Sequence, residues 1–89
     1  MGSEQPHPPA DLLELVLAVF QAVLDNEDVD ADTDFFEAGG NSILAARAVT
    51  RVQKQSGAEV SFRDILFART AKELAAKIED KGPRGSRAV

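Results

Sequence analysis

The sequence predicts an all-α fold: a small four-helix bundle of three longer helices and one short helix, with a long loop between the first two. Composition is one reason, because Ala, Leu, Val, Glu, Lys and Arg dominate, while Trp and Tyr are absent and Phe occurs only five times. Periodicity is another, because apolar residues recur three and four positions apart in separate segments. A chain of 89 residues without an internal repeat accommodates one such domain.

The first helix is expected from Asp11 to Leu24, where Asp11 and Glu14 have capping-box spacing. Prolines upstream favour a disordered tail over residues 1–9. The apolar side chains that recur at helical spacing should face the core: Leu13, Val16, Leu17, Phe20 and Leu24. Others widen this surface, so the helix should be buried on more than one side: Leu12, Leu15 and Val19.

A long polar loop follows, over residues 25–41, and three apolar residues in it are expected to pin it onto the helices: Val29, Phe35 and Phe36. The second helix should begin at Asn41 or Ser42 and end near Ser56, with Gly57 as the stop. Its core face would hold Ala45, Ala48, Val49 and Val52. Its opposite face would hold Ile43, Ala46, Arg47, Thr50 and Lys54.

Two further helices complete the expected bundle. A short helical turn is expected from Arg63 to Phe67, capped by Ser61 with Asp64 three residues on. The last helix should run from Thr70, which starts a capping-box pattern, to Asp80, with an inner stripe of Leu74, Ala75 and Ile78. The folded domain would then occupy residues 10–80, and residues 81–89 would form a flexible tail.

Charge and composition exclude several classes of function. The net charge is −5, with nine carboxylates and no Lys or Arg from Asp11 to Glu37, which disfavours nucleic-acid binding. The apolar run Leu12–Leu24 is too short to cross a bilayer, and no basic leader is visible, so a cytoplasmic protein is the expectation. A monomer is also expected. No cysteine is present and the single histidine is His7, so metal sites and catalytic triads are not expected.

The most informative segment runs from Asp34 to Leu44 and reads Asp-Phe-Phe-Glu-Ala-Gly-Gly-Asn-Ser-Ile-Leu. The glycine pair leaves the start of the next helix uncrowded, and Ser42 then lies beside unpaired backbone N–H groups at its positive end. A phosphodiester there would be favoured by roughly 0.3–1 kcal/mol. The alternative for Asn41 or Ser42 is a helix N-cap without further function.

This segment resembles the core motif of peptidyl carrier proteins of nonribosomal peptide synthetases. The resemblance covers about Asp11 to Asp80 and implies that Ser42 carries 4′-phosphopantetheine within a motif of Asp34, Phe35, Phe36, Gly39, Gly40 and Asn41. The segments Val60–Leu66 and Thr70–Ile78 look like the family's third and fourth helices. The chain departs from the family pattern at Ala38, at Asn41 and in Phe67-Ala68-Arg69.

The resemblance implies a carrier protein rather than an enzyme. A chain that begins at Met1 and ends soon after the last helix suits a free-standing carrier, although an excised module would look the same. A phosphopantetheinyl transferase would add the arm from coenzyme A, and the arm's thiol would hold an aminoacyl or peptidyl thioester. Implied partners are adenylation, condensation, thioesterase or tailoring enzymes. The residues expected to contact them are Ile43, Ala46, Arg47, Thr50 and Phe67.

Three other functions compete with that of a peptidyl carrier. A carrier of polyketide or fatty-acid type is disfavoured because the segment 38–58 contains no Asp or Glu. A calcium site at Asp28, Asp30, Asp32 and Asp34 lacks the Gly and Glu that an EF-hand needs at loop positions 6 and 12. An unmodified helical interaction domain would differ from a carrier by failing to gain mass when it is treated with coenzyme A and a transferase.

Overall fold

The computed structural model describes residues 9–81, and within this range the chain contains only helices and loops. The helices are α1 (Pro9–Leu24), α2 (Ser42–Ser56), α3 (Phe62–Phe67) and α4 (Ala71–Lys81). The all-α fold with one short helix and a long first loop is therefore confirmed. The tails expected at 1–9 and 81–89 lie, apart from their innermost residues, outside the described part of the chain.

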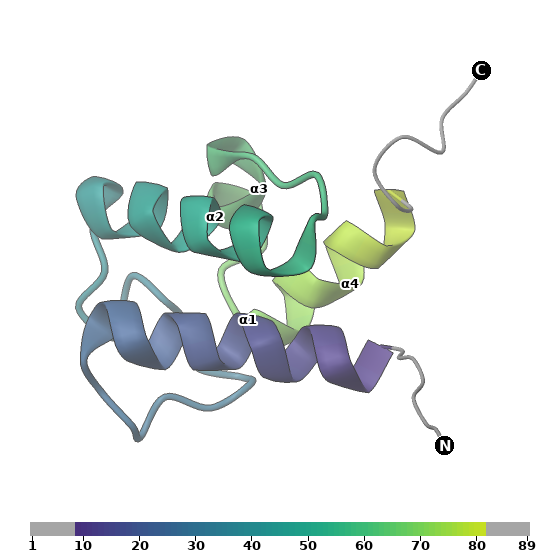
Figure 1. Cartoon of the computed structure of the whole chain (residues 1–89). Helices are drawn as coiled ribbons and strands as arrows, with labels where there is room; N and C mark the ends of the chain where they lie inside the picture. Colours follow the sequence, from purple (N-terminus) through teal and green to yellow (C-terminus); the bar gives the residue numbers. More distant parts are fainter. Residues whose placement is uncertain (1–8, 82–89) are drawn as a thin grey trace.

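The helices α1 and α2 run antiparallel and side by side (Figure 1). Helix α1 also packs against α4, and the short α3 contacts both α2 and α4. The loop between α1 and α2 leaves the C-terminal end of α1, runs along the bundle and comes back to the same end, where α2 begins (Figure 1). This arrangement places the start of α2 at one end of the bundle.

Helix α1 begins at Pro9, two residues before the predicted start at Asp11. Proline is compatible with the first turn of a helix, because the backbone N–H that it lacks has no acceptor there. The helix therefore extends into the segment that its prolines had suggested was irregular.

The core is built from small and medium apolar side chains around two phenylalanines. Its largest fully buried members are Phe20, Phe35, Ile65, Leu74, Val16, Val52 and Val60. In α1 the most buried positions are Val16, Val19 and Phe20, whereas Leu13, Leu17 and Leu24 are only partly buried. The difference from the predicted stripe follows from packing, because α1 contacts α2 and α4 at once and buries the residues between them.

Helix α2 has the two faces that the sequence predicts. Ala45, Ala48, Val49 and Val52 are buried. The helix ends at Gly57, whose φ of 72° is the left-handed conformation typical of a helix C-cap, and its N–H donates to the carbonyl of Gln53 at 2.8 Å.

The caps of the last two helices are also as predicted. Ser61 and Asp64 form a reciprocal capping box at α3, which begins at Phe62 rather than Arg63. At α4, the Thr70 hydroxyl accepts a hydrogen bond from the Glu73 N–H at 3.1 Å, so Thr70 caps a helix that begins at Ala71. The inner stripe of α4 is buried at Leu74, Ala75 and Ile78.

No helix within residues 9–81 is both long and apolar enough to cross a bilayer.

Candidate functional site

Ser42 is the first residue of α2, and it is exposed. The N-cap is its neighbour Asn41, whose extended backbone (φ −147°, ψ −177°) precedes the helix and whose Oδ1 accepts from the Leu44 N–H at 2.9 Å. The Ser42 hydroxyl makes no hydrogen bond with any residue that the structure describes. The two polar residues at this junction therefore have separate roles: Asn41 satisfies the helix end, and Ser42 presents a hydroxyl to solvent.

The two glycines before this junction are needed for different reasons. Gly39 has φ +108°, a conformation that side chains rarely allow, although the space around it is open. Gly40 has an ordinary φ but lies on the Phe35 ring, where an added Cβ would collide with the ring and come within 2.6 Å of the Phe35 carbonyl oxygen. The pair thus turns the chain at the first position and lets it approach the core at the second.

Two phenylalanines anchor the loop, as the sequence predicts. Phe35 is completely buried, and its ring lies 4.8 Å from the Phe20 ring of α1, centroid to centroid. Phe36 is partly buried and meets Phe35 edge-on at 5.3 Å. The buried Val29 pins the earlier part of the loop.

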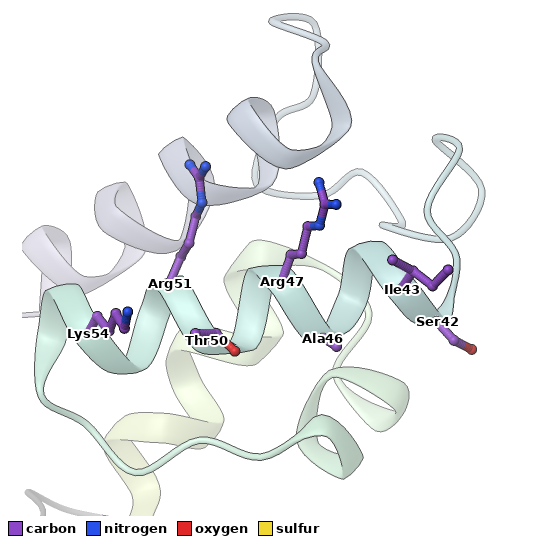
Figure 2. Close-up of a pocket in the computed structure, with 7 residues that line it drawn as sticks. All are labelled: Ser42, Ile43, Ala46, Arg47, Thr50, Arg51 and Lys54. Carbon is purple, nitrogen blue, oxygen red and sulfur yellow. The ribbon is translucent and has the colours of Figure 1, made fainter.

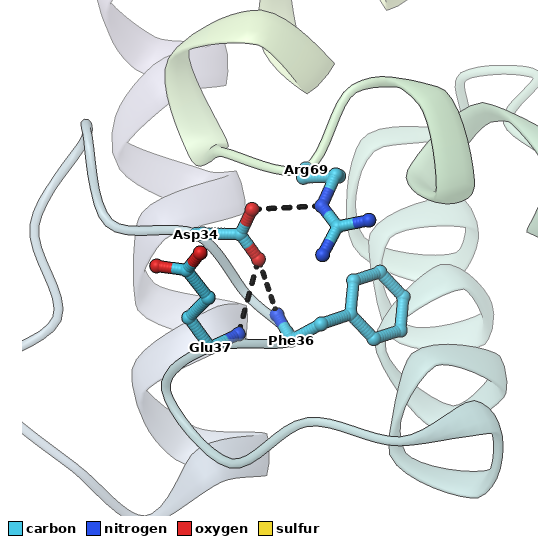
Figure 3. A network of polar contacts seen from close by, with 4 residues as sticks. All are labelled: Asp34, Phe36, Glu37 and Arg69. Carbon is cyan, nitrogen blue, oxygen red and sulfur yellow. Dashed lines mark hydrogen bonds and ion pairs between the residues drawn. The ribbon is translucent and has the colours of Figure 1, made fainter.

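Asp34 begins the turn that leads to the glycines. Its Oδ1 accepts from the N–H groups of Phe36 (2.8 Å) and Glu37 (3.1 Å), while its Oδ2 accepts from the Arg69 Nε at 2.7 Å (Figure 3). The Arg69 guanidinium also lies 5.0 Å from the centre of the Phe36 ring. The hydrogen bond from Arg69 is the main cause that lowers the pKa of the Asp34 carboxyl from its ordinary value.

The outer face of α2 forms an open groove that starts at Ser42. Its lining residues are Ser42, Ile43, Ala46, Arg47, Thr50, Arg51 and Lys54 (Figure 2). Ile43 has 69% of its surface exposed, which excludes a core role for this side chain. The cations at 47, 51 and 54 form no ion pair with any residue in the described range. We call these seven residues the α2 face.

The structure therefore gathers Ser42, Ile43, Ala46, Arg47 and Thr50 into one surface, as the sequence predicts. Phe67 is 71% exposed but belongs to α3 and does not line the groove. Two residues escaped prediction. Arg51 carries a visible signal, since it lies one helical turn from Arg47. Arg69 carries none, because its partner Asp34 is 35 positions away in sequence.

The acidic loop contains no metal cluster. Within residues 9–81, no three His, Cys, Asp or Glu side chains converge on a possible ion. Asp30 instead shapes the loop, since its Oδ1 accepts from the Asp32 N–H at 2.9 Å and the Thr33 hydroxyl at 3.0 Å. The backbone hydrogen bond from Asp32 is the main cause that lowers the pKa of Asp30.

The described chain is thus a small helical bundle with an exposed serine at the start of its second long helix, and comparison with known proteins shows the family to which such a chain belongs. The family model described as "Phosphopantetheine attachment site" matches residues 10–78. The chain belongs to this family of carrier proteins, whose cofactor is covalently attached 4′-phosphopantetheine.

Solved structures and a curated relative point to nonribosomal peptide synthesis. A non-ribosomal PCP domain shares 34% identity and a TM-score of 0.68, over 83% of this chain and 92% of that one. BlmI, a type-II acyl-carrier-protein from Streptomyces verticillus involved in bleomycin biosynthesis, shares 29% identity and a TM-score of 0.77, over 82% and 88%.

A probable non-canonical nonribosomal peptide synthetase, CymA, from Salinispora arenicola is 37% identical over 70 residues, which are 79% of this chain and 1% of the relative. The chain spans only between 1% and 6% of the curated relatives it matches. The protein is a carrier of the nonribosomal peptide synthetase type.

Proposed function

We propose that Ser42 is the attachment site, and that the chain carries an aminoacyl or peptidyl thioester on a 4′-phosphopantetheine arm at this residue. The observation that supports this assignment is the exposed Ser42 hydroxyl, which makes no hydrogen bond in the described chain and stands at a helix N-terminus. Asn41 already caps the helix, so the hydroxyl can be modified without loss of the cap.

The attachment chemistry would take place on a phosphopantetheinyl transferase. The Ser42 oxygen forms a bond to the pantetheine-linked phosphorus of coenzyme A, and the bond to the bridging oxygen breaks. Adenosine 3′,5′-bisphosphate leaves, aided by Mg²⁺, and the hydroxyl proton passes to a base of the transferase. The resulting phosphodiester would lie at the positive end of α2, which favours an anion. The chain itself would catalyse no step.

The α2 face supports a role in partner recognition. A transferase or an adenylation, condensation, thioesterase or tailoring enzyme that receives Ser42 must approach the start of α2. It would then meet Ile43, Ala46, Arg47 and Thr50. Phe67 of α3 is another exposed apolar side chain that such an enzyme could contact. Small transient interfaces depend on a few anchors, and Ile43 is the exposed large apolar side chain of α2. Coenzyme A and these enzymes would be met in the cytoplasm.

The test is the intact mass of the protein before and after incubation with coenzyme A and a broad-specificity phosphopantetheinyl transferase. We expect the wild type to gain one phosphopantetheine and Ser42→Ala to gain none, with unchanged circular dichroism as the fold control. Fragmentation of the modified protein should place the group on Ser42 rather than on Ser56 or Ser61. A wild type that gains no mass would favour an unmodified interaction domain, and a modified Ser42→Ala protein would move the site.

Loading separates this proposal from the polyketide or fatty-acid alternative. The modified protein should accept an aminoacyl group from an adenylation enzyme, detected as a further mass gain that hydroxylamine removes. Efficient loading by a malonyl transferase in place of an adenylation enzyme would favour the alternative. The absence of acidic residues from α2 supports the peptidyl type.

A further inference from the structure

We propose that Asp34 and Arg69 are positioning residues for Ser42: their ion pair holds the turn before α2 in the shape that presents the serine to the transferase. The inference rests on the proposed role of Ser42 and deepens it. It concerns two side chains whose described contacts do not include Ser42, and which act through the backbone between Asp34 and Asn41.

Arg69, one partner of the ion pair, lies in the segment between α3 and α4. Arg69 holds the loop through three contacts, which its guanidinium and its backbone carbonyl make. Its Nε donates to Asp34 Oδ2 at 2.7 Å, its carbonyl oxygen accepts from the Phe35 N–H at 2.7 Å, and its guanidinium lies over the Phe36 ring. Because α4 begins two residues later and is buried against α1, Arg69 joins the turn to the rigid part of the bundle.

Asp34, the other partner, is linked to Ser42 through the turn between residues 34 and 40. Asp34 Oδ1 accepts hydrogen bonds from the N–H groups of Phe36 and Glu37, and the Asp34 carbonyl oxygen accepts one from the Ala38 N–H at 3.0 Å. The turn closes when the Gly40 N–H donates to the Phe35 carbonyl at 3.0 Å. Gly40 is followed directly by the cap Asn41 and then by Ser42, so a displacement of the turn is transmitted to the start of α2.

A second ion pair between the same loop and α4 provides a matched comparison. Lys72 Nζ lies 3.9 Å from Asp32 Oδ1, and both side chains are largely exposed, at 69% and 82%. The Asp34 and Arg69 side chains are more enclosed, at 22% and 46%, and their atoms are in hydrogen-bond contact. No described contact of the Lys72 side chain reaches the turn between Asp34 and Gly40, so its removal should not move Ser42.

We call the Asp34–Arg69 ion pair the clamp. Its loss should lower the fraction of molecules in which the turn between Asp34 and Gly40 has the conformation that presents Ser42 to the transferase. The apparent affinity of a partner falls in proportion to that fraction. We therefore expect the effect in the KM for the carrier and in kcat/KM, with kcat changed little. The melting temperature should fall by no more than about 5 °C, because exposed ion pairs contribute little to stability.

The experiment measures transfer from coenzyme A by a broad-specificity phosphopantetheinyl transferase while the concentration of carrier is varied. The proteins are the wild type, Arg69→Gln, Asp34→Asn, the double variant and the control Lys72→Gln. We expect each clamp variant to lose about three- to tenfold in kcat/KM, the control to stay close to wild type, and the double variant to resemble the worse single variant, because residues of one network are not additive.

Hydrogen exchange gives a readout that does not depend on the transferase. The amides of Gly39 and Gly40 should exchange several-fold faster in Arg69→Gln than in the wild type or in Lys72→Gln, while amides in the middle of α1 keep their rates. A wild type that gains no mass would defeat the proposed function alone, since the exchange rates are still measured. Unchanged exchange and unchanged KM in Arg69→Gln, or losses that multiply in the double variant, would overturn the clamp.

Discussion

The segments on the two sides of Ser42 differ in how their side chains are used. Before the serine, from Asp34 to Gly40, side chains and backbone are committed to contacts within the protein: a buried ring, an ion pair and a closed turn. After it, the outward side chains of α2 are exposed, and its cations have no ion-pair partner in the described chain. The comparison suggests that the first segment holds the serine in place and the second meets other proteins.

We expect the largest loss of stability from a substitution in the segment before the serine, residues 34–40. Phe35→Ala would remove a fully buried ring that contacts Phe20 and supports Gly40, at a cost of about 3–5 kcal/mol. A small domain has only about 5–15 kcal/mol in total, so a large part of its stability would be lost. Phe36→Ala should cost less, because Phe36 is only partly buried.

Urea unfolding followed by circular dichroism measures both free energies of unfolding. The loop is not anchored as described if both variants unfold at the same urea concentration as the wild type. The difference between the two phenylalanines would disappear if Phe36→Ala lost as much as Phe35→Ala.

On the other side of the serine, Ile43→Asp should impair partner contact without harm to the fold. The side chain is 69% exposed, and an acidic residue in the first turn of a helix is favourable for the helix. With the arm already attached, we expect about a tenfold loss in kcat/KM for aminoacylation by the cognate adenylation enzyme. The matched control is Ala76→Asp on the exposed side of α4, which should load normally.

Arg47→Glu should have a smaller effect of a different kind. A charge at the edge of an interface acts mainly on the encounter rate, so the loss should be about threefold at low salt and should shrink as salt is added. Lys77→Glu on α4 is the control for the change in net charge. Equal losses in both variants would mean that overall charge, rather than the α2 face, governs loading.

The smallest effect should be a pH dependence at Asp34. Because Arg69 lowers the pKa of this carboxyl in the folded protein, the stability it contributes is present above its ordinary pKa of 3.8 and is lost as the pH falls through the lower folded value. The melting temperature of Asp34→Asn should therefore differ most from that of the wild type near neutral pH, and the difference should narrow below pH 3.8. A difference that stays constant down to the most acid pH would show that the Arg69 contact does not perturb Asp34.

The accuracy of the sequence-based expectations depended on how local each feature is. The faces of α2, its end at Gly57 and the capping box at Ser61 follow from spacing and residue type within a few positions, and they were predicted correctly. The stripe of α1 was only partly right, because the choice of Val19 over Leu17 depends on where α2 and α4 lie. The Arg69 contact could not be predicted, because no local pattern links residues 35 positions apart.

The capping of α2 by Asn41 has a consequence for how a loaded carrier is recognised. Since the Ser42 oxygen has no described hydrogen bond to lose, esterification there removes nothing that holds the bundle together. The unmodified, modified and loaded forms should therefore share one backbone, and attachment of the arm should raise the melting temperature by at most a few degrees, because the start of α2 favours an anion. Under that condition an enzyme cannot read the loading state from the shape of the protein. It must detect the arm or its cargo directly, and the order of steps in an assembly line would be set by the enzymes rather than by the carrier.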